Sequence, residues 1–108
     1  MNRLLALAFL FAALCNPAAA GELEDLTAKA EQGDCIDQYD LGVAYYFGNA
    51  GPQDYKQAYI WLSVAVTNGY DDAAEKRDKA ALELTPEALT EAQAEAAALD
   101  KKIKELNN

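Results

Sequence analysis

The feature that most constrains the fold is the stretch from Ala30 to Gly69, in which two apolar runs with helical spacing flank a glycine-rich turn. In the second run apolar residues recur at intervals of three and four, which places them on one face of an α-helix. These residues are Ala58, Trp61, Leu62, Ala65 and Val66. The first run has the same spacing at Leu41, Gly42 and Tyr45, and the small Gly42 permits a second helix to approach closely. The stretch therefore predicts an antiparallel helical hairpin.

The turn between the two runs carries residues that end one helix and begin another. Gly48, Gly51 and Pro52 interrupt the first helix, because glycine and proline are poor helix formers. Asp54 can then cap the second helix by accepting hydrogen bonds from its free N–H groups. We expect Trp61 to be the largest core residue of the hairpin and Tyr45 to lie in the same core.

Twelve residues of this stretch also follow the spacing of a known repeat: Ala30, Gly33, Gln38, Leu41, Gly42, Tyr45, Gly48, Asp54, Ala58, Trp61, Ala65 and Gly69. In these residues the chain resembles a Sel-one-like repeat, a relative of the tetratricopeptide repeat. Ala50 and Gly51 depart from the pattern, which has glycine and valine there. The resemblance implies an all-α fold, a short α-α superhelix of antiparallel helical hairpins with about five helices. It also implies a role as an adaptor that binds other proteins.

Residues on either side of the core repeat, 33–69, predict incomplete neighbours within one domain, 21–108. Apolar residues at helical spacing indicate an N-terminal helix over 22–32, which would cover one side of the hairpin. After Gly69, 36 residues beyond Gly33, a partial repeat over 70–84 begins with Asp71 as the expected helix cap. It then diverges, because Arg77 and Asp78 stand where the leucine and glycine of the first repeat should recur.

The last helix is predicted over 86–106, with Thr85 as its cap and Pro86 at its first position. Its apolar residues repeat every seven positions: Leu89, Ala92, Ala96, Leu99, Ile103 and Leu106. Such a stripe can fold back as a cap on the end of the repeat stack. It can also pair with a second copy of the chain, although two alanines make a weak coiled coil. We favour the cap.

The first 20 residues have the features of a secretory signal peptide. Arg3 precedes an apolar run from Leu4 to Leu14, and three alanines form a cleavage site that ends at Ala20. A lipoprotein signal would use Cys15, but the leucine before it is large for that processing. We expect cleavage after Ala20, a periplasmic or secreted protein, and no stable membrane insertion of the mature chain.

Charge narrows the possible partners. Cleavage removes one basic residue, so the formal charge changes from −9 to −10. A field of that sign repels phosphate, so we expect no binding to nucleic acid. The acidic residues can serve to attract a basic protein or peptide, or simply to keep an exported domain in solution. A third possibility is an acidic inhibitor of a secreted enzyme.

Residues for catalysis are scarce. The chain has no histidine, so the most common general base and metal ligand are missing. Cys35 is the single cysteine of the mature chain, so it is either a small packed side chain or available for a disulfide between chains. Ser63 has no basic residue within four positions, and a nucleophile needs an activating partner. We therefore expect no enzyme activity, no cofactor and no metal site.

The remaining candidate is a binding surface on the first helix of the hairpin. By analogy with tetratricopeptide repeats, the concave face would carry Ile36, Tyr39, Asp40, Val43, Tyr46 and Phe47. Aromatic residues commonly anchor interfaces, and the acidic neighbours favour a cationic ligand. This strip can instead be covered by the first or the last helix. The resulting hypothesis is a non-catalytic module that binds a protein or peptide. The alternative is a structural homodimer, held through the last helix or through Cys35.

Overall fold

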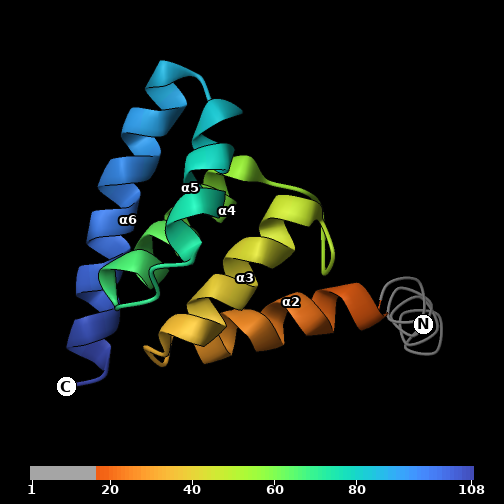
Figure 1. Ribbon diagram of the computed structural model, residues 1–108. Coiled ribbons are helices and arrows are strands. Elements are labelled where there is room, and N and C mark those ends of the chain that lie inside the picture. The colour runs from red at the N-terminus through yellow and green to blue at the C-terminus, as the bar shows by residue number, and fades with distance from the viewer. Residues whose placement is uncertain (1–16) are drawn as a thin grey trace, which may run out of the picture.

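The computed structural model describes residues 17–108, and every regular element in this range is an α-helix (Figure 1). The helices are α2 (Pro17–Ala30), α3 (Cys35–Phe47), α4 (Tyr55–Thr67), α5 (Ala73–Leu82) and α6 (Pro86–Leu106). The predicted all-α fold of about five helices is thus confirmed for this range. Most of the predicted signal peptide lies outside the described residues, and its last four residues form the first turn of α2.

Helix α4 is the centre of the fold. It contacts α3, α5 and α6, while α2 packs on α3 (Figure 1). The buried residues of α4 are Ala58, Ile60, Trp61, Leu62, Val64 and Ala65. These positions lie on more than one side of the helix, because α4 has three helical neighbours. Trp61 is confirmed as a core residue at 5% exposure, whereas Tyr45 is half-buried at the edge of the core.

The α3–α4 hairpin is held at the distance that Gly42 permits. A Cβ atom placed on Gly42 would lie 2.7 Å from Leu62 Cγ and 3.2 Å from the Leu62 backbone nitrogen. The first separation is shorter than real Cβ contacts and the second is tight, so a larger residue fits only if Leu62 or its backbone shifts. The predicted close approach of the two helices at this glycine is therefore present.

The ends of these two helices are capped by aspartates. Asp54 begins α4 as predicted, since its carboxylate accepts a hydrogen bond from the Gln57 N–H at 3.0 Å. Asp34 caps α3 in the same way, accepting from the Ile36 N–H at 2.8 Å, which the sequence analysis missed. Gly48 ends α3 in the left-handed conformation, with φ +72°, a conformation that favours glycine.

Helix α2 differs from the predicted helix at both ends. It begins at Pro17 rather than residue 22, because proline suits the first helical position and the alanines that follow are strong helix formers. It ends at Ala30 rather than residue 32, where Gly33 at φ +100° closes a turn by donating to the Ala30 carbonyl. As expected, α2 covers one side of the hairpin. The cluster it joins contains Ala30, Leu41, Trp61, Val64 and Ile103, with Leu23, Leu26, Tyr45 and Leu99 packed against it.

The hairpin formed by α5 and α6 is open. The two helices diverge from the turn at residues 83–85, and each packs on α4 with little contact between them (Figure 1). In one hydrophobic cluster Ala73 and Ala80 of α5 pack with α4, and in another Ala92 and Ala96 of α6 pack with Ile60. No cluster of the described residues joins α5 directly to α6. Helices α5 and α6 therefore lie apart where both pack on α4, and we call the space between them the wedge.

The start of α5 corrects the prediction for Asp71. The N-cap residue is Asp72, and its side chain makes no capping hydrogen bond. Its backbone already has helical angles, φ −62° and ψ −21°, whereas a capping side chain needs an extended backbone. Asp71 contributes its carbonyl, which accepts from the Ala74 N–H at 3.0 Å. The helix ends at Leu82, two residues before the predicted end of the partial repeat.

Helix α6 folds back on α4, as predicted for a terminal cap. Thr85 accepts a hydrogen bond from the Ala88 N–H at 3.1 Å, and Pro86 occupies the first helical position. Three of the six heptad positions are buried: Ala92, Ala96 and Ile103. On the surface, Lys56 of α4 forms ion pairs with Glu91 at 2.9 Å and Glu95 at 3.0 Å. The hydrogen bonds to these two carboxylates raise the pKa of Lys56.

A series of hydrogen-bonded polar side chains, which we call the polar chain, joins four helices. The fully buried Gln38 donates to the Ala30 carbonyl at 3.2 Å and accepts from Asn68 Nδ2 at 3.1 Å. Asn68 also donates to Asp100 at 3.0 Å, and Asp100 pairs with Lys104 at 2.7 Å. The buried Gln38 thus has a hydrogen-bond partner for both its amide nitrogen and its amide oxygen, as burial requires. The polar chain connects the ends of α2, α3 and α4 to α6.

Candidate binding site

The predicted strip on α3 faces α5 rather than either terminal helix. Tyr39 and Tyr46 pack beside a cluster formed by residues of α4 and α5. Val43 is half-buried on the same face, between these two tyrosines in the sequence. The two ends of the strip, Ile36 and Phe47, are each 54% exposed. Asp40, one turn after Ile36, is also exposed. The strip is therefore exposed at both ends, and α5 borders it at Tyr39, Tyr46 and Phe47.

Aromatic rings contact one another along the strip. The Tyr39 ring lies 4.8 Å from the Tyr70 ring, measured between centroids. Tyr46 meets Phe47 edge to face at 4.9 Å, and it meets Tyr55 at 5.4 Å. These separations are those of favourable aromatic pairs. Each of Tyr39, Tyr46 and Phe47 therefore has an aromatic partner within the chain.

A cation already lies on the aromatic end of the strip. The ammonium group of Lys76, on α5, lies 4.9 Å from the centroid of the Phe47 ring and 5.4 Å from that of Tyr46. Both distances fall within the range of cation–π attraction. Sequence reasoning missed this contact, because Lys76 lies 29 positions after Phe47 and the contact depends on how α5 packs.

Charged residues surround the other part of the strip. A small cavity of about 140 Å³ is lined by Tyr39, Asp72, Glu75, Lys76 and Lys79. Burial raises the pKa of Tyr70, and the carboxylates of Asp72 and Asp40 raise it further. The lining of this cavity carries two acidic and two basic side chains, and Lys79 is paired with Glu75 at 3.3 Å.

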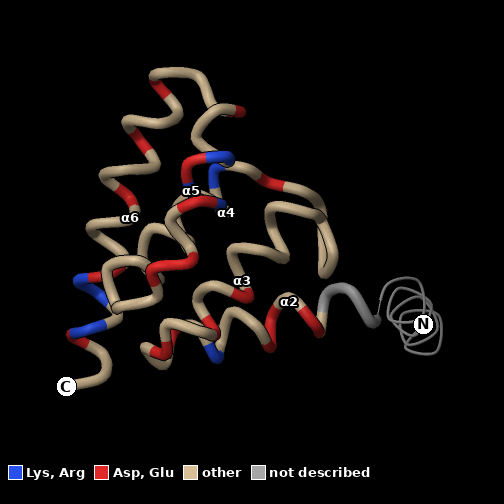
Figure 2. The backbone as a smooth tube through the Cα atoms, viewed as in Figure 1, with Lys and Arg blue, Asp and Glu red and all other residues tan. Residues whose placement is uncertain are grey.

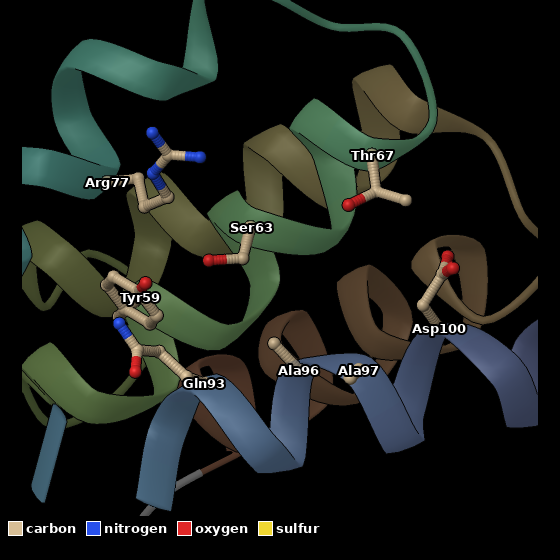
Figure 3. Close-up of a pocket in the computed structure, with 8 residues that line it drawn as sticks. All are labelled: Tyr59, Ser63, Thr67, Arg77, Gln93, Ala96, Ala97 and Asp100. Atoms are coloured by element: carbon tan, nitrogen blue, oxygen red, sulfur yellow. The ribbon is translucent and has the colours of Figure 1, made fainter. Parts of the chain in front are cut away.

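A larger cavity of about 380 Å³ occupies the wedge between α5 and α6 (Figure 3). Tyr59, Ser63 and Thr67 form its α4 wall at intervals of four residues. Helix α5 contributes Arg77, and α6 contributes four residues: Gln93, Ala96, Ala97 and Asp100. The sequence analysis named none of these as site residues, although the replacement of a core leucine by Arg77 was a signal that this position is not part of a packed core.

A third hollow lies between α2 and α3. Its volume is about 390 Å³, and its lining residues are Leu23, Glu24, Thr27, Ala28, Glu31 and Tyr45. Burial raises the pKa of Tyr45 above its ordinary value of 10.0, and the Asp54 carboxylate raises it further. Only the tyrosine comes from α3, so this hollow is mainly a surface of α2.

Two other findings concern the predicted chemistry. Cys35 is a half-buried free thiol in the first turn of α3. Within residues 17–108, no helix is long and apolar enough to cross a membrane. Figure 2 shows most basic residues on α5 and at the C-terminal end of α6, and acidic residues on every labelled helix except α4; α2 and α4 carry one lysine each, Lys29 and Lys56.

Comparison of the chain with models of known protein families and with curated proteins found no match. The resemblance to Sel-one-like repeats therefore depends on the residues quoted above and stays a prediction. Function is accordingly argued from the surfaces and cavities of this structure.

Proposed function

We propose that the mature chain is a periplasmic or secreted helical-repeat protein of the Sel-one-like type that binds a basic peptide or protein segment and performs no chemistry on it. The proposed site is the α3 strip of Ile36, Tyr39, Asp40, Val43, Tyr46 and Phe47, together with the adjoining face of α5. The observation that carries the proposal is the position of Lys76 over two aromatic rings.

Lys76 supports the proposal because it marks where a cationic side chain is stabilised. Contacts of this kind contribute about 0.5–2 kcal/mol, depending on how much water is excluded. A lysine or arginine of a partner can occupy the same place if Lys76 swings away, which its flexible side chain allows. Exposed Ile36 and Phe47 then offer apolar contacts at the two ends of the strip.

Overall charge supports the same class of partner. The chain has 18 acidic and 9 basic residues, so its field attracts basic segments and speeds their encounter. The alternative of a dimer through α6 has less support, since three of its six heptad positions already pack inside the chain.

Binding of a lysine-rich peptide to the purified protein tests the proposal directly. We expect Lys76→Gln to strengthen this binding several-fold, because it removes the internal competitor for the rings. Lys102→Gln is the matched control, since it removes the same charge from the exposed face of α6. If both variants strengthen binding equally, the effect is one of net charge and the aromatic site is wrong.

The natural partner can be sought by site-specific cross-linking in the exported fraction of the host. A photoreactive amino acid is placed at Phe47 in one variant and at Leu82 in another, because Leu82 is 85% exposed and lies outside the strip. The proposal expects a partner with a basic segment to be captured at position 47 and absent at position 82. Capture of the same proteins at both positions would contradict it.

A further inference from the structure

The cavity between α5 and α6 has the dimensions of a ligand site. Its volume of about 380 Å³ falls within the range of roughly 300–1,000 Å³ typical of small-molecule pockets. The spacing of Tyr59 and Thr67 along α4 is eight residues, which corresponds to about 12 Å at 1.5 Å per residue. The α4 wall of the cavity is therefore about 12 Å long, and we call this cavity the groove.

The middle of the groove contains a polar atom that lacks a partner. Ser63 Oγ is buried and forms no hydrogen bond within the described chain. Two other helical hydroxyls, those of Thr27 and Thr90, donate to the carbonyl four residues earlier. Ser63 does not bond in this way, and Figure 3 shows its hydroxyl pointing toward the Arg77 and Tyr59 end of the cavity. A buried hydroxyl without a partner is unfavourable, so a rotation about χ1 of Ser63 that lets the hydroxyl bond to a ligand in the cavity adds to affinity.

One end of the groove carries a positive charge. Arg77 directs Nε and Nη2 to the same oxygen of Asp78, at 3.1 Å each. A guanidinium has five N–H donors in a planar fork, so three remain for a carboxylate. The paired Asp78 also orients the guanidinium, which favours binding because less conformational freedom is then lost.

The other end carries a negative charge. Asp100 is held by Asn68 at 3.0 Å and by Lys104 at 2.7 Å. An ionised carboxylate can accept about four hydrogen bonds, so it can still receive an ammonium group. Figure 3 shows Arg77 and Asp100 toward opposite ends of the cavity, with Ser63 between them and Ala96 and Ala97 along the α6 wall. The small alanines leave room for a ligand backbone.

We propose that this groove binds a short peptide of about three residues with free termini. An extended chain advances about 3.3–3.6 Å per residue, so three residues cover about 10 Å, which is close to the length of the α4 wall. The peptide carboxylate pairs with Arg77, its ammonium group pairs with Asp100, and a central amide bonds to Ser63. A simple anion could pair with Arg77 but would leave Asp100 without a cationic partner from the ligand, and a neutral sugar would pair with neither.

Titration with trialanine, followed by amide chemical shifts of the purified protein, tests this site independently of the α3 strip. Saturable shifts are expected at Ser63, Ala96 and Ala97. Trialanine amide and N-acetyl-trialanine should each bind at least ten-fold more weakly, because each lacks one terminal charge. Equal binding of trialanine and its amide, shifts confined to α3, no saturable shift at millimolar peptide, or binding of maltose in place of trialanine would each overturn the proposal.

Two variants separate binding from folding. Arg77→Gln should weaken trialanine binding at least ten-fold and leave the weak binding of the amide unchanged, whereas Lys102→Gln should change neither. Ser63→Ala should weaken trialanine binding several-fold while the thermal midpoint stays the same or rises, because the variant removes a buried hydroxyl without a partner. If Ser63→Ala leaves trialanine binding unchanged, the groove does not hold the peptide as described.

Discussion

The two hairpins of this chain, α3–α4 and α5–α6, differ in how their helices meet. In the first, α3 lies so close to α4 that Gly42 has no room for a side chain. In the second, α5 and α6 scarcely touch, and a cavity of about 380 Å³ lies between them. The residues 36 positions after Leu41 and Gly42 are Arg77 and Asp78. Two substitutions therefore distinguish a packed hairpin from an open one.

The hairpins differ because Leu41 and Gly42 can be buried, whereas Arg77 and Asp78 cannot be buried without a large cost. Leu41 is fully buried, and Gly42 allows close contact. Arg77 and Asp78 pair with each other at 3.1 Å, and Asp78 is 70% exposed. Charged side chains of this kind stay near water because burying them is unfavourable. The second hairpin thus retains the repeat spacing but has a polar groove where the first has a core.

The largest difference between the hairpins should appear on truncation of the paired residues Leu41 and Arg77. Leu41→Ala removes a fully buried side chain and should lower the free energy of unfolding by about 2–5 kcal/mol. Arg77→Ala loses a surface ion pair and should change the free energy of unfolding by about 1 kcal/mol or less. Urea denaturation measures both. Equal losses would show that α5 and α6 form a packed core after all.

A second contrast concerns the buried amide of the first hairpin. Gln38→Leu removes the hydrogen bonds to Ala30 and Asn68 and should lower the free energy of unfolding by about 1–3 kcal/mol. The residue 36 positions later is Ala74, so Ala74→Gln is the matched control and should stay within about 0.5 kcal/mol. Loss of amide-exchange protection at the end of α4 should accompany the first variant alone. If Gln38→Leu leaves stability and protection intact, the polar chain is not structural.

The local features of the fold could be predicted from the sequence. Apolar spacing identified the helices, and residue type identified the caps at Asp54 and Thr85. The role of Gly42 followed from its place on the apolar face. These signals succeed because each depends on residues a few positions apart. The predicted cap at Asp71 was wrong. The residue before α5 is Asp72, and its backbone already has helical angles, so its side chain does not cap the helix.

The features that join distant segments could not be predicted in the same way. Asn68 contacts Gln38 and Asp100, which lie 30 and 32 residues away in the sequence. Lys76 reaches the rings of Tyr46 and Phe47 only because of the angle at which α5 packs. The same is true of the cavity, since its lining comes from three helices. The sequence did carry one clue, the charged pair at positions 77 and 78.

A third and smaller contrast tests Gly42 and Asp78 themselves. Gly42→Ala gains about 1 kcal/mol of helix propensity but forces a clash that costs about 1–3 kcal/mol. The expected net loss is about 1 kcal/mol. Asp78→Ala should be neutral within about 0.5 kcal/mol, because it lies on the exposed face of α5. Thermal denaturation of the two alanine variants compares the same substitution in both hairpins, and a more stable Gly42→Ala protein would contradict the close packing.

The smallest effect should be a loss of stability at high pH, and it compares Tyr45 of the first hairpin with Tyr70 at the entrance to the second. Burial raises the pKa of both residues above 10.0. The folded state therefore favours the neutral phenol. Above pH 10 the unfolded chain loses these protons first, so the free energy of unfolding falls as pH rises through the folded-state pKa values. Tyr45→Phe and Tyr70→Phe should each make this decline shallower in urea denaturation, with no such pH-dependent benefit at pH 7. An unchanged decline in Tyr45→Phe would show that burial in the hollow between α2 and α3 does not raise the pKa of Tyr45.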